Sequence, residues 1–168
     1  TFSLKHNDII ELTLNGSLSK NYISSGAAYF YNKKTGSTVK LDLSGNRISG
    51  FPDVTINAIL KINYENLLVQ LTGKYVGSFF TDNYDNKLAD YLKIYSKVAD
   101  YTDNKVDAYF VANFYASYNL FINSYLKNIK LYMQINNIFD NLYAAYGIGK
   151  EFFPAAERNY LFGVKIGL

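Results

Sequence analysis

Long segments of this chain alternate apolar and polar side chains at every second residue, and this pattern limits what the chain can fold into. Successive side chains of a β-strand point to opposite faces, so a period of two predicts strands with two chemically different faces. The segment 10–18, for example, has apolar residues and one glycine at its even positions and polar residues at its odd positions. The pattern predicts six long strands, near residues 8–18, 53–64, 66–79, 105–118, 128–137 and 158–168.

The predicted strands are long, and their connections alternate in length. They run about 10 to 13 residues, whereas soluble strands have about five or six and a tilted membrane strand needs about 9 to 11. Short links at 65–66 and near 123–124 alternate with long connections at roughly 80–104 and 137–157. Short turns on one side and long loops on the other are typical of outer-membrane barrels. The chain is therefore predicted to be all-β, in an antiparallel transmembrane β-barrel.

Composition favours strands over helices as the elements that cross a membrane. No apolar run approaches the roughly 18 residues of a transmembrane helix, and the mean hydropathy is −0.10. The 17 tyrosines and 12 phenylalanines suit a membrane–water interface, because aromatic rings concentrate there. We expect the apolar strand faces to meet lipid and the polar faces to line a lumen, because four lysines share the polar faces: Lys61, Lys74, Lys130 and Lys165.

The sequence lacks the patterns typical of an enzyme, a cofactor site, a metal site or a nucleic-acid interface. It has no cysteine, and its scattered lysines give a net charge of only +3. The single histidine, His6, is expected in a solvated turn outside the strands. Ser24 and Ser25 have no nearby histidine or acid that would activate them. The segment 82–86 is rich in calcium-type oxygen ligands but lacks the full twelve-residue loop pattern, so a solvated loop is expected.

The number of strands leaves two barrel architectures open. Six strands are too few to close a membrane barrel, whose minimum is about eight. A weaker hairpin at 26–43, turning at 33–36, would complete a small eight-stranded barrel; otherwise the chain is part of a larger one. Helical spacing within the polar stretch 81–104 also allows a short helix there, on Leu88, Tyr91, Leu92, Tyr95 and Val98. Because the chain starts at Thr1, we expect a mature product or a fragment.

Several motifs resemble those of TonB-dependent outer-membrane receptors. The segment 134–143, QINNIFDNLY, is similar to the signature of that family's penultimate strand. The segment 152–159, FFPAAERN, resembles the pattern that leads into its last strand. Weaker similarities lie at 45–52 and 75–83. The motif residues that carry the resemblance are Asn136, Asn137, Phe139, Asp140, Tyr143, Pro154 and Arg158.

The resemblance implies a fold, a location and partners. Residues 1–168 would form a single segment, the C-terminal part of a barrel of about 22 strands. A plug domain and the region that contacts the TonB energy-coupling protein would lie upstream of this chain. The hairpin at 26–43 would then be an extracellular loop. The family takes up scarce ligands such as iron–siderophore complexes or cobalamin across a Gram-negative outer membrane, so lipid and a small ligand are the expected partners.

The motif aromatics and asparagines have expected roles. Asn136 and Asn137 would hydrogen-bond backbone where the penultimate strand reaches the rim. An outer aromatic girdle would contain Phe139, Tyr143, Phe152, Phe153 and Tyr160, and a periplasmic girdle Tyr64, Tyr118, Phe121 and Tyr125.

The last strand has the pattern of a barrel-closing strand and assembly signal. It would pair with a first strand outside this chain and so remove the sheet edge. The family usually ends in an aromatic residue, whereas this chain ends in leucine. The residues expected to form the signal are Tyr160, Phe162, Gly163, Ile166 and Leu168.

Three functions therefore remain open for this sequence. The first is the wall of an uptake receptor, with ligand contacts from the loops at 19–52, 80–104 and 141–157. The second is a complete eight-stranded barrel with a structural or adhesion role, and the third is a soluble β-rich binding module. The sequence does not identify the contact residues, although four loop tyrosines could offer aromatic contacts: Tyr84, Tyr91, Tyr95 and Tyr101.

Overall fold

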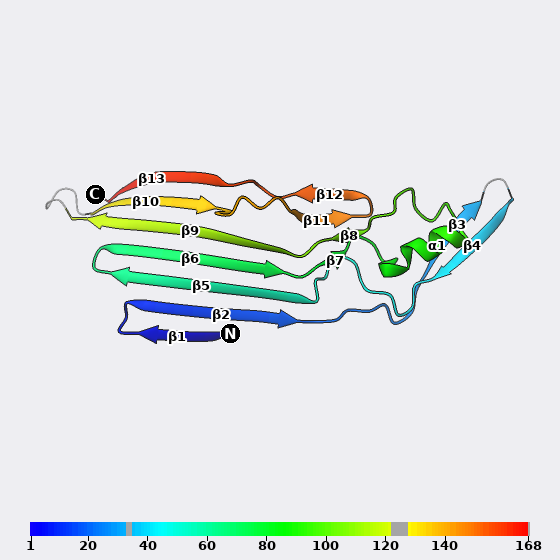
Figure 1. The fold of residues 1–168 in the computed structure, drawn as a ribbon, viewed down its shortest axis with the longest axis horizontal. Helices are drawn as coiled ribbons and strands as arrows, with labels where there is room; N and C mark the ends of the chain where they lie inside the picture. The colour runs from blue at the N-terminus through cyan, green and yellow to red at the C-terminus, as the bar shows by residue number, and fades with distance from the viewer. Residues whose placement is uncertain (33–34, 122–127, 168) are drawn as a thin grey trace.

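An open sheet of seven antiparallel strands dominates the structure. The computed structural model describes residues 1–32, 35–121 and 128–167. The strands pair in the order β1-β2-β5-β6-β9-β10-β13, which is a meander, and they run side by side along the long axis of the molecule (Figure 1). Their bounds are Phe2–His6 (β1), Ile10–Leu18 (β2), Val54–Tyr64 (β5), Leu67–Val76 (β6), Tyr109–Leu120 (β9), Asn128–Asn136 (β10) and Asn159–Gly167 (β13). The predicted antiparallel, barrel-type fold is confirmed, as a sheet that does not close on itself.

The first strand was not expected. Residues 2–6 form β1, which pairs with β2 in register from Phe2–Leu14 to His6–Ile10. The prediction that His6 lies in a turn outside the strands is therefore wrong, because His6 ends β1. The turn itself lies at Asn7 and Asp8, both with positive φ, a conformation that asparagine and aspartate tolerate better than most residues.

Short elements fill the long connections and lie beyond one end of the sheet. Figure 1 shows them at the end opposite the β5–β6 turn and the C-terminus. We call this the outer end. A small buried core of Val76, Phe79 and Val106 lies where it joins the sheet. The elements are Ala27–Asn32 (β3), Ser37–Asp42 (β4), Phe79–Phe80 (β7), Asp85–Lys87 (η1), Leu88–Ile94 (α1), Lys105–Val106 (β8), Ala144–Ile148 (β11) and Glu151–Pro154 (β12).

The predicted hairpin at 26–43 and the predicted short helix both exist. The hairpin is β3–β4, but it forms a separate two-stranded sheet and does not join the seven strands. It therefore does not complete an eight-stranded barrel within the described residues. The β11–β12 hairpin, in contrast, was missed inside the connection 137–157. The predicted turns at 33–34 and 123–124 lie outside the described residues.

One face of the main sheet is apolar across all seven strands. Successive pairings align one residue from each strand in a single row on this face. Most large apolar side chains of the face are exposed, and contiguous exposed apolar surface is limited to small patches on most soluble monomers. This argues against the soluble binding module. The row is Leu4, Leu12, Leu60, Leu71, Phe114, Ile135 and Tyr160.

The opposite face is polar, and the register shows it directly. The neighbouring row on that face is Lys5, Glu11, Lys61, Gln70, Tyr115, Gln134 and Leu161. The four lysines expected on one face all lie there, and Lys130 is directly opposite Lys165. No helix in the described part of the chain is long and apolar enough to cross a membrane.

Candidate functional site

The long connections at the outer end are tied to one another by hydrogen bonds. The Gly50 amide donates to the Phe80 carbonyl at 2.8 Å, which joins the loop 19–52 to the loop 80–104. The Thr81 hydroxyl donates to the Gly149 carbonyl at 2.7 Å, and the Gly149 amide donates back to the Thr81 carbonyl at 2.9 Å. The three loops expected to hold ligand contacts therefore form one connected platform.

Asn46 is the central polar residue of this platform. Its side chain is fully buried, at 0% exposure. Its amide nitrogen donates to the Asn83 carbonyl at 3.0 Å and to the Tyr91 hydroxyl at 3.1 Å, and its amide oxygen accepts from the Lys87 ammonium at 2.6 Å. A buried amide with all these partners fixes loop geometry, because any displacement leaves polar groups unpaired.

Asp85 joins the same two loops through its carboxylate. It is 8% exposed and has a φ of 59°. One carboxylate oxygen accepts from the Arg47 amide at 3.0 Å and the other from the Asn86 amide. The Asp85 carbonyl also accepts from the Asn104 side chain at 2.9 Å. The expectation of a solvated acidic loop is therefore wrong for Asp85, because its carboxylate is buried and satisfied by backbone donors.

Asp82 organises the other half of the loop 80–104. One carboxylate oxygen accepts from the Tyr84 amide at 2.7 Å and from the Asn104 side chain at 2.9 Å. The other accepts from the Tyr101 hydroxyl at 2.8 Å. Burial, and then this hydrogen bond to Asp82, raise the pKa of Tyr101 well above its usual value. Within the described residues no three histidine, cysteine or acidic side chains group as metal ligands.

The four loop tyrosines considered as ligand contacts also make contacts within the platform. Tyr84 and Tyr91 meet edge to face, with ring centroids 6.0 Å apart, and the Tyr91 hydroxyl donates to the Asp42 carbonyl. The Tyr95 ring packs on Phe30 at 6.1 Å. The tyrosines that do expose their rings at the outer end are Tyr22, Tyr29, Tyr31 and Tyr146. Alternation within 27–32 was the signal that could have found two of them.

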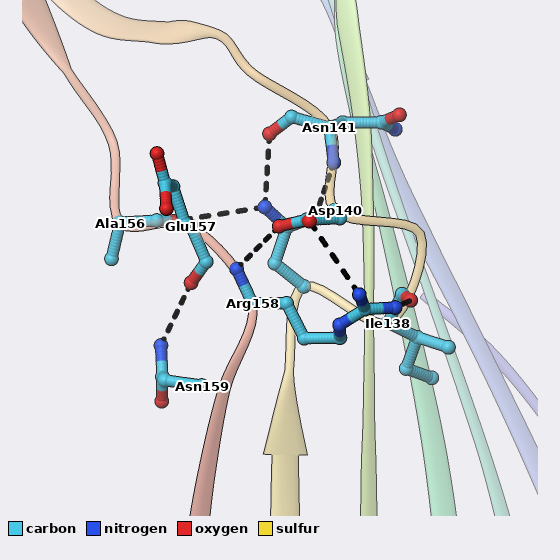
Figure 2. Close-up of polar contacts among 8 residues, drawn as sticks. Ile138, Asp140, Asn141, Ala156, Glu157, Arg158 and Asn159 are labelled. Atoms are coloured by element: carbon cyan, nitrogen blue, oxygen red, sulfur yellow. Dashed lines mark hydrogen bonds and ion pairs between the residues drawn. The ribbon is translucent and has the colours of Figure 1, made fainter.

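A second polar cluster, the rim clamp, joins the end of β10 to the start of β13 (Figure 2). Asn137 is 3% exposed and has a φ of 54°. Its side-chain nitrogen donates to the carbonyls of Asn141 and Ala156, and its side-chain oxygen accepts from the Asn141 amide. Its own amide donates to the Asn113 side chain. These bonds match the expectation that Asn137 pairs with backbone at the rim.

Asp140 and Arg158 form the charged part of the rim clamp. Asp140 has a φ of 55°, and its carboxylate accepts from the Arg158 amide at 2.8 Å. The Arg158 guanidinium lies 3.5 Å from the same carboxylate and donates to the Ile138 carbonyl at 3.4 Å. Figure 2 shows both residues facing each other across the turn. Two motif residues 18 positions apart thus hold the two last strands of the sheet at the rim.

The other motif residues lie around the clamp in different ways. Asn136 bonds the side chains of Gln134 and Asn159 rather than backbone. Tyr143 stacks on Tyr109 with ring centroids 4.2 Å apart and is half-buried. Pro154 ends β12. The remaining residues expected in the outer girdle are exposed: Phe139, Phe152, Phe153 and Tyr160.

At the opposite end of the sheet, the aromatics expected in the periplasmic girdle are also exposed where the structure describes them. These are Tyr64, Tyr118 and Phe121. Tyr125 lies outside the described residues, as does Leu168 of the expected assembly signal.

Gly163 in β13 is required by a close approach of an aromatic ring. A Cβ at this position would lie 2.2 Å from the Cζ atom of Tyr132, which is directly opposite on β10. The Tyr132 ring therefore covers the glycine and adds cross-strand contact at the last pairing of the sheet. Of the other signal residues, Tyr160, Phe162 and Ile166 lie on the exposed apolar face.

Comparisons with known proteins add evidence on the fold. No family model matches the sequence, and no curated protein does. Among solved structures, the chain is similar to the ferric citrate transporter FecA in its unliganded form, with a TM-score of 0.55 and 13% identity over 91% of this chain. It is also similar to a variant of the ferric enterobactin receptor PfeA from Pseudomonas aeruginosa (0.54, 18% and 95%). A third structure is the ferric-catecholate import receptor Fiu from E. coli K12 (0.53, 14% and 93%).

These similarities define the class of fold. The chain has the fold of part of a large receptor barrel, and it spans 20%, 20% and 25% of the lengths of the three chains. The resemblance to TonB-dependent receptors that the motif residues suggested is thus supported by structure, at the level of the fold. The three neighbours are described as a transporter and two receptors, not as enzymes.

Proposed function

We propose that this chain forms part of the wall of an outer-membrane receptor that takes up a scarce small ligand, such as an iron chelate or cobalamin, with energy supplied through TonB. The observation that carries the proposal is the apolar face that continues across all seven strands, opposite a polar face with four lysines. Such a wall meets lipid on one side and water on the other. The three structural neighbours, an iron transporter and two iron receptors by description, support the class of ligand.

In this proposal residues 1–168 are a single barrel segment, and the plug and the TonB contact belong to a region upstream of it. The outer platform presents the ligand-facing loops. Its buried polar bonds at Asn46, Asp82 and Asp85 hold these loops in place before ligand arrives, which lowers the ordering cost of binding. The expected ligands are therefore bound by residues on the platform surface.

The rim clamp and the last strand have roles in assembly in the same proposal. The clamp fixes the geometry with which β13 leaves the rim, because Asp140 and Arg158 are bonded to each other and to backbone. β13 carries the closing signal on Tyr160, Phe162, Gly163, Ile166 and Leu168. Its free edge is paired when the barrel closes, since a barrel leaves no exposed edge.

Two measurements in the native host test the proposed function. Membrane fractionation of the complete protein is expected to place it with the outer membrane. Deletion of its gene should abolish growth on one member of a panel of iron chelates and cobalamin, while growth on a simple ferrous salt stays normal. Reintroduction of the gene is the control and should restore growth. Recovery of the protein in the soluble fraction, or normal growth of the deletion strain on every member of the panel, would show that the proposal is wrong.

A further inference from the structure

The β3–β4 hairpin has one buried face and one exposed face. Its side chains alternate between the two faces over Ala28–Asn32 in one strand and over Thr38–Asp42 in the other. The buried face packs on the platform: Leu41 is 5% exposed, and Phe30 meets Tyr95. The hairpin projects at the end of the molecule farthest from the C-terminus (Figure 1). Its other face is therefore exposed at the outer end.

The exposed face carries two tyrosines that nothing else in the described chain covers. Tyr29 and Tyr31 are each 64% exposed, and they lie two residues apart on one strand, which separates them by about 7 Å. Directly across the hairpin, Tyr29 is paired with Lys40 and Tyr31 with Thr38. The two rings thus form a short aromatic strip bordered by an ammonium group and a hydroxyl group.

A polar hollow continues this strip toward the base of the hairpin. It has a volume of 640 Å³ and is lined by Ser25, Gly26, Ala27, Lys40, Asp42 and Ser44. One oxygen of the Asp42 carboxylate accepts from both the amide and the hydroxyl of Ser44. These bonds lower the pKa of Asp42, so the group stays ionised and its second oxygen is an acceptor for a ligand hydroxyl.

We propose that the strip Tyr29–Tyr31 and the adjoining hollow form a binding site for a neutral oligosaccharide, separate from the proposed uptake of a small ligand. The C–H bonds on the face of a sugar ring pack on an aromatic face, while its equatorial hydroxyls need donors and acceptors at the edge. Lys40 and Asp42 supply one donor and one acceptor there. Rigid amphipathic rings with a few convergent polar groups are typical of specific ligand sites.

The chemistry of the lining favours this ligand over two others. An apolar peptide segment would leave the lysine, the carboxylate and the two serines of the hollow without partners, and burying unpaired polar groups is costly. A nucleic acid or another polyanion needs a net positive site, whereas the lining of the hollow includes one cation, Lys40, and one anion, Asp42. A neutral polyhydroxylated chain can pack its C–H groups on the two rings and hydrogen-bond the polar groups with its hydroxyls.

Calorimetric titration of the complete protein in detergent micelles tests the site, with maltohexaose, cellohexaose and chitohexaose as separate probes. We expect at least one to bind. The double substitution Tyr29→Ala and Tyr31→Ala should weaken that binding about tenfold or more, because two stacking contacts are lost. Replacing both tyrosines by phenylalanine keeps the rings and should change the affinity by less than about threefold. Tyr64→Ala, an exposed tyrosine at the far end of the sheet, is the matched control and should have no effect.

Three results would overturn the proposal. One is the absence of binding by all three hexasaccharides, and another is equal affinity in the double alanine variant and the parent. The third is tighter binding of a heparin-derived hexasaccharide than of any neutral probe, since this would indicate an anion site. Growth on iron chelates reports on the uptake function separately, so loss of sugar binding with normal growth leaves the proposed uptake function standing.

Discussion

A lysine placed on the apolar face should destabilise the protein, while a lysine at the next residue should not. Leu71 is 43% exposed on the apolar face and lies in the middle of β6, between Leu60 and Phe114. Its neighbour Thr72 points to the polar face, between Ile59 and Asn113. In a membrane, a lysine near the middle of the lipid-facing band costs about 2–4 kcal/mol, whereas a lysine that faces a lumen costs little.

The comparison of Leu71→Lys with Thr72→Lys turns this difference into a measurement. Denaturant unfolding of the complete protein in lipid vesicles should show a loss of about 2–4 kcal/mol for Leu71→Lys, a factor of about 30 to 1,000 in the unfolding equilibrium constant. Thr72→Lys should lie within about 0.5 kcal/mol of the parent. Equal losses for the two variants, or a larger loss for Thr72→Lys, would refute the assignment of the two faces.

Three further predictions concern single contacts. Gly163→Ala should destabilise the protein by about 1–3 kcal/mol, because the new methyl group overlaps the Tyr132 ring; the additional change Tyr132→Ala should recover part of this loss in the same unfolding assay. Asn137→Ala should cost about 1–3 kcal/mol, because the Asn141 and Ala156 carbonyls lose the buried Asn137 side chain as their donor, and hydrogen exchange at the β10–β13 rim would detect the opening. Tyr101→Phe should cost about 1 kcal/mol at neutral pH through the lost bond to Asp82. Folding raises the pKa of Tyr101, so its contribution to the free energy of unfolding is complete below about pH 10. That contribution falls as the pH rises further. The free energy of unfolding should therefore decrease less between about pH 9 and 12 in the variant than in the parent.

The strands could be predicted from the sequence because their pattern is local. Each of the six long strands was found, since an apolar face and a polar face impose an alternation that a single segment already shows. β1 was missed because only five residues alternate there and the positive-φ turn at Asn7 and Asp8 hides the start of β2. The register between neighbouring strands could not be predicted, because it depends on how two strands pair and not on the pattern within one. It is this register that aligns the apolar row across the sheet.

The outer platform was much harder to predict, because its contacts join residues far apart in the chain. Asn46 reaches Lys87 over 41 positions, and the Asp100 carboxylate pairs with Lys150 over 50. Asn46 lies in the weaker motif similarity at 45–52, but that similarity did not predict its full burial. The rim clamp is an intermediate case: resemblance to a known pattern identified Asn137, Asp140 and Arg158, but their bonds to one another came only from the structure.

The platform separates the residues that hold its shape from those that meet the outside. Its internal bonds join Asn46 to Tyr91 and the Arg47 amide to Asp85 across two loops, and Tyr101 to Asp82 within one loop. Tyr29, Tyr31 and Lys40, in contrast, are exposed on one face of the hairpin. Substitutions on that face can therefore change what is bound at small cost in stability, since exposed positions are energetically tolerant. Substitutions at Asn46 or Asp85 affect two loops at once, because each residue is bonded to both. A platform built this way can vary its exposed face without rebuilding the loops that carry it.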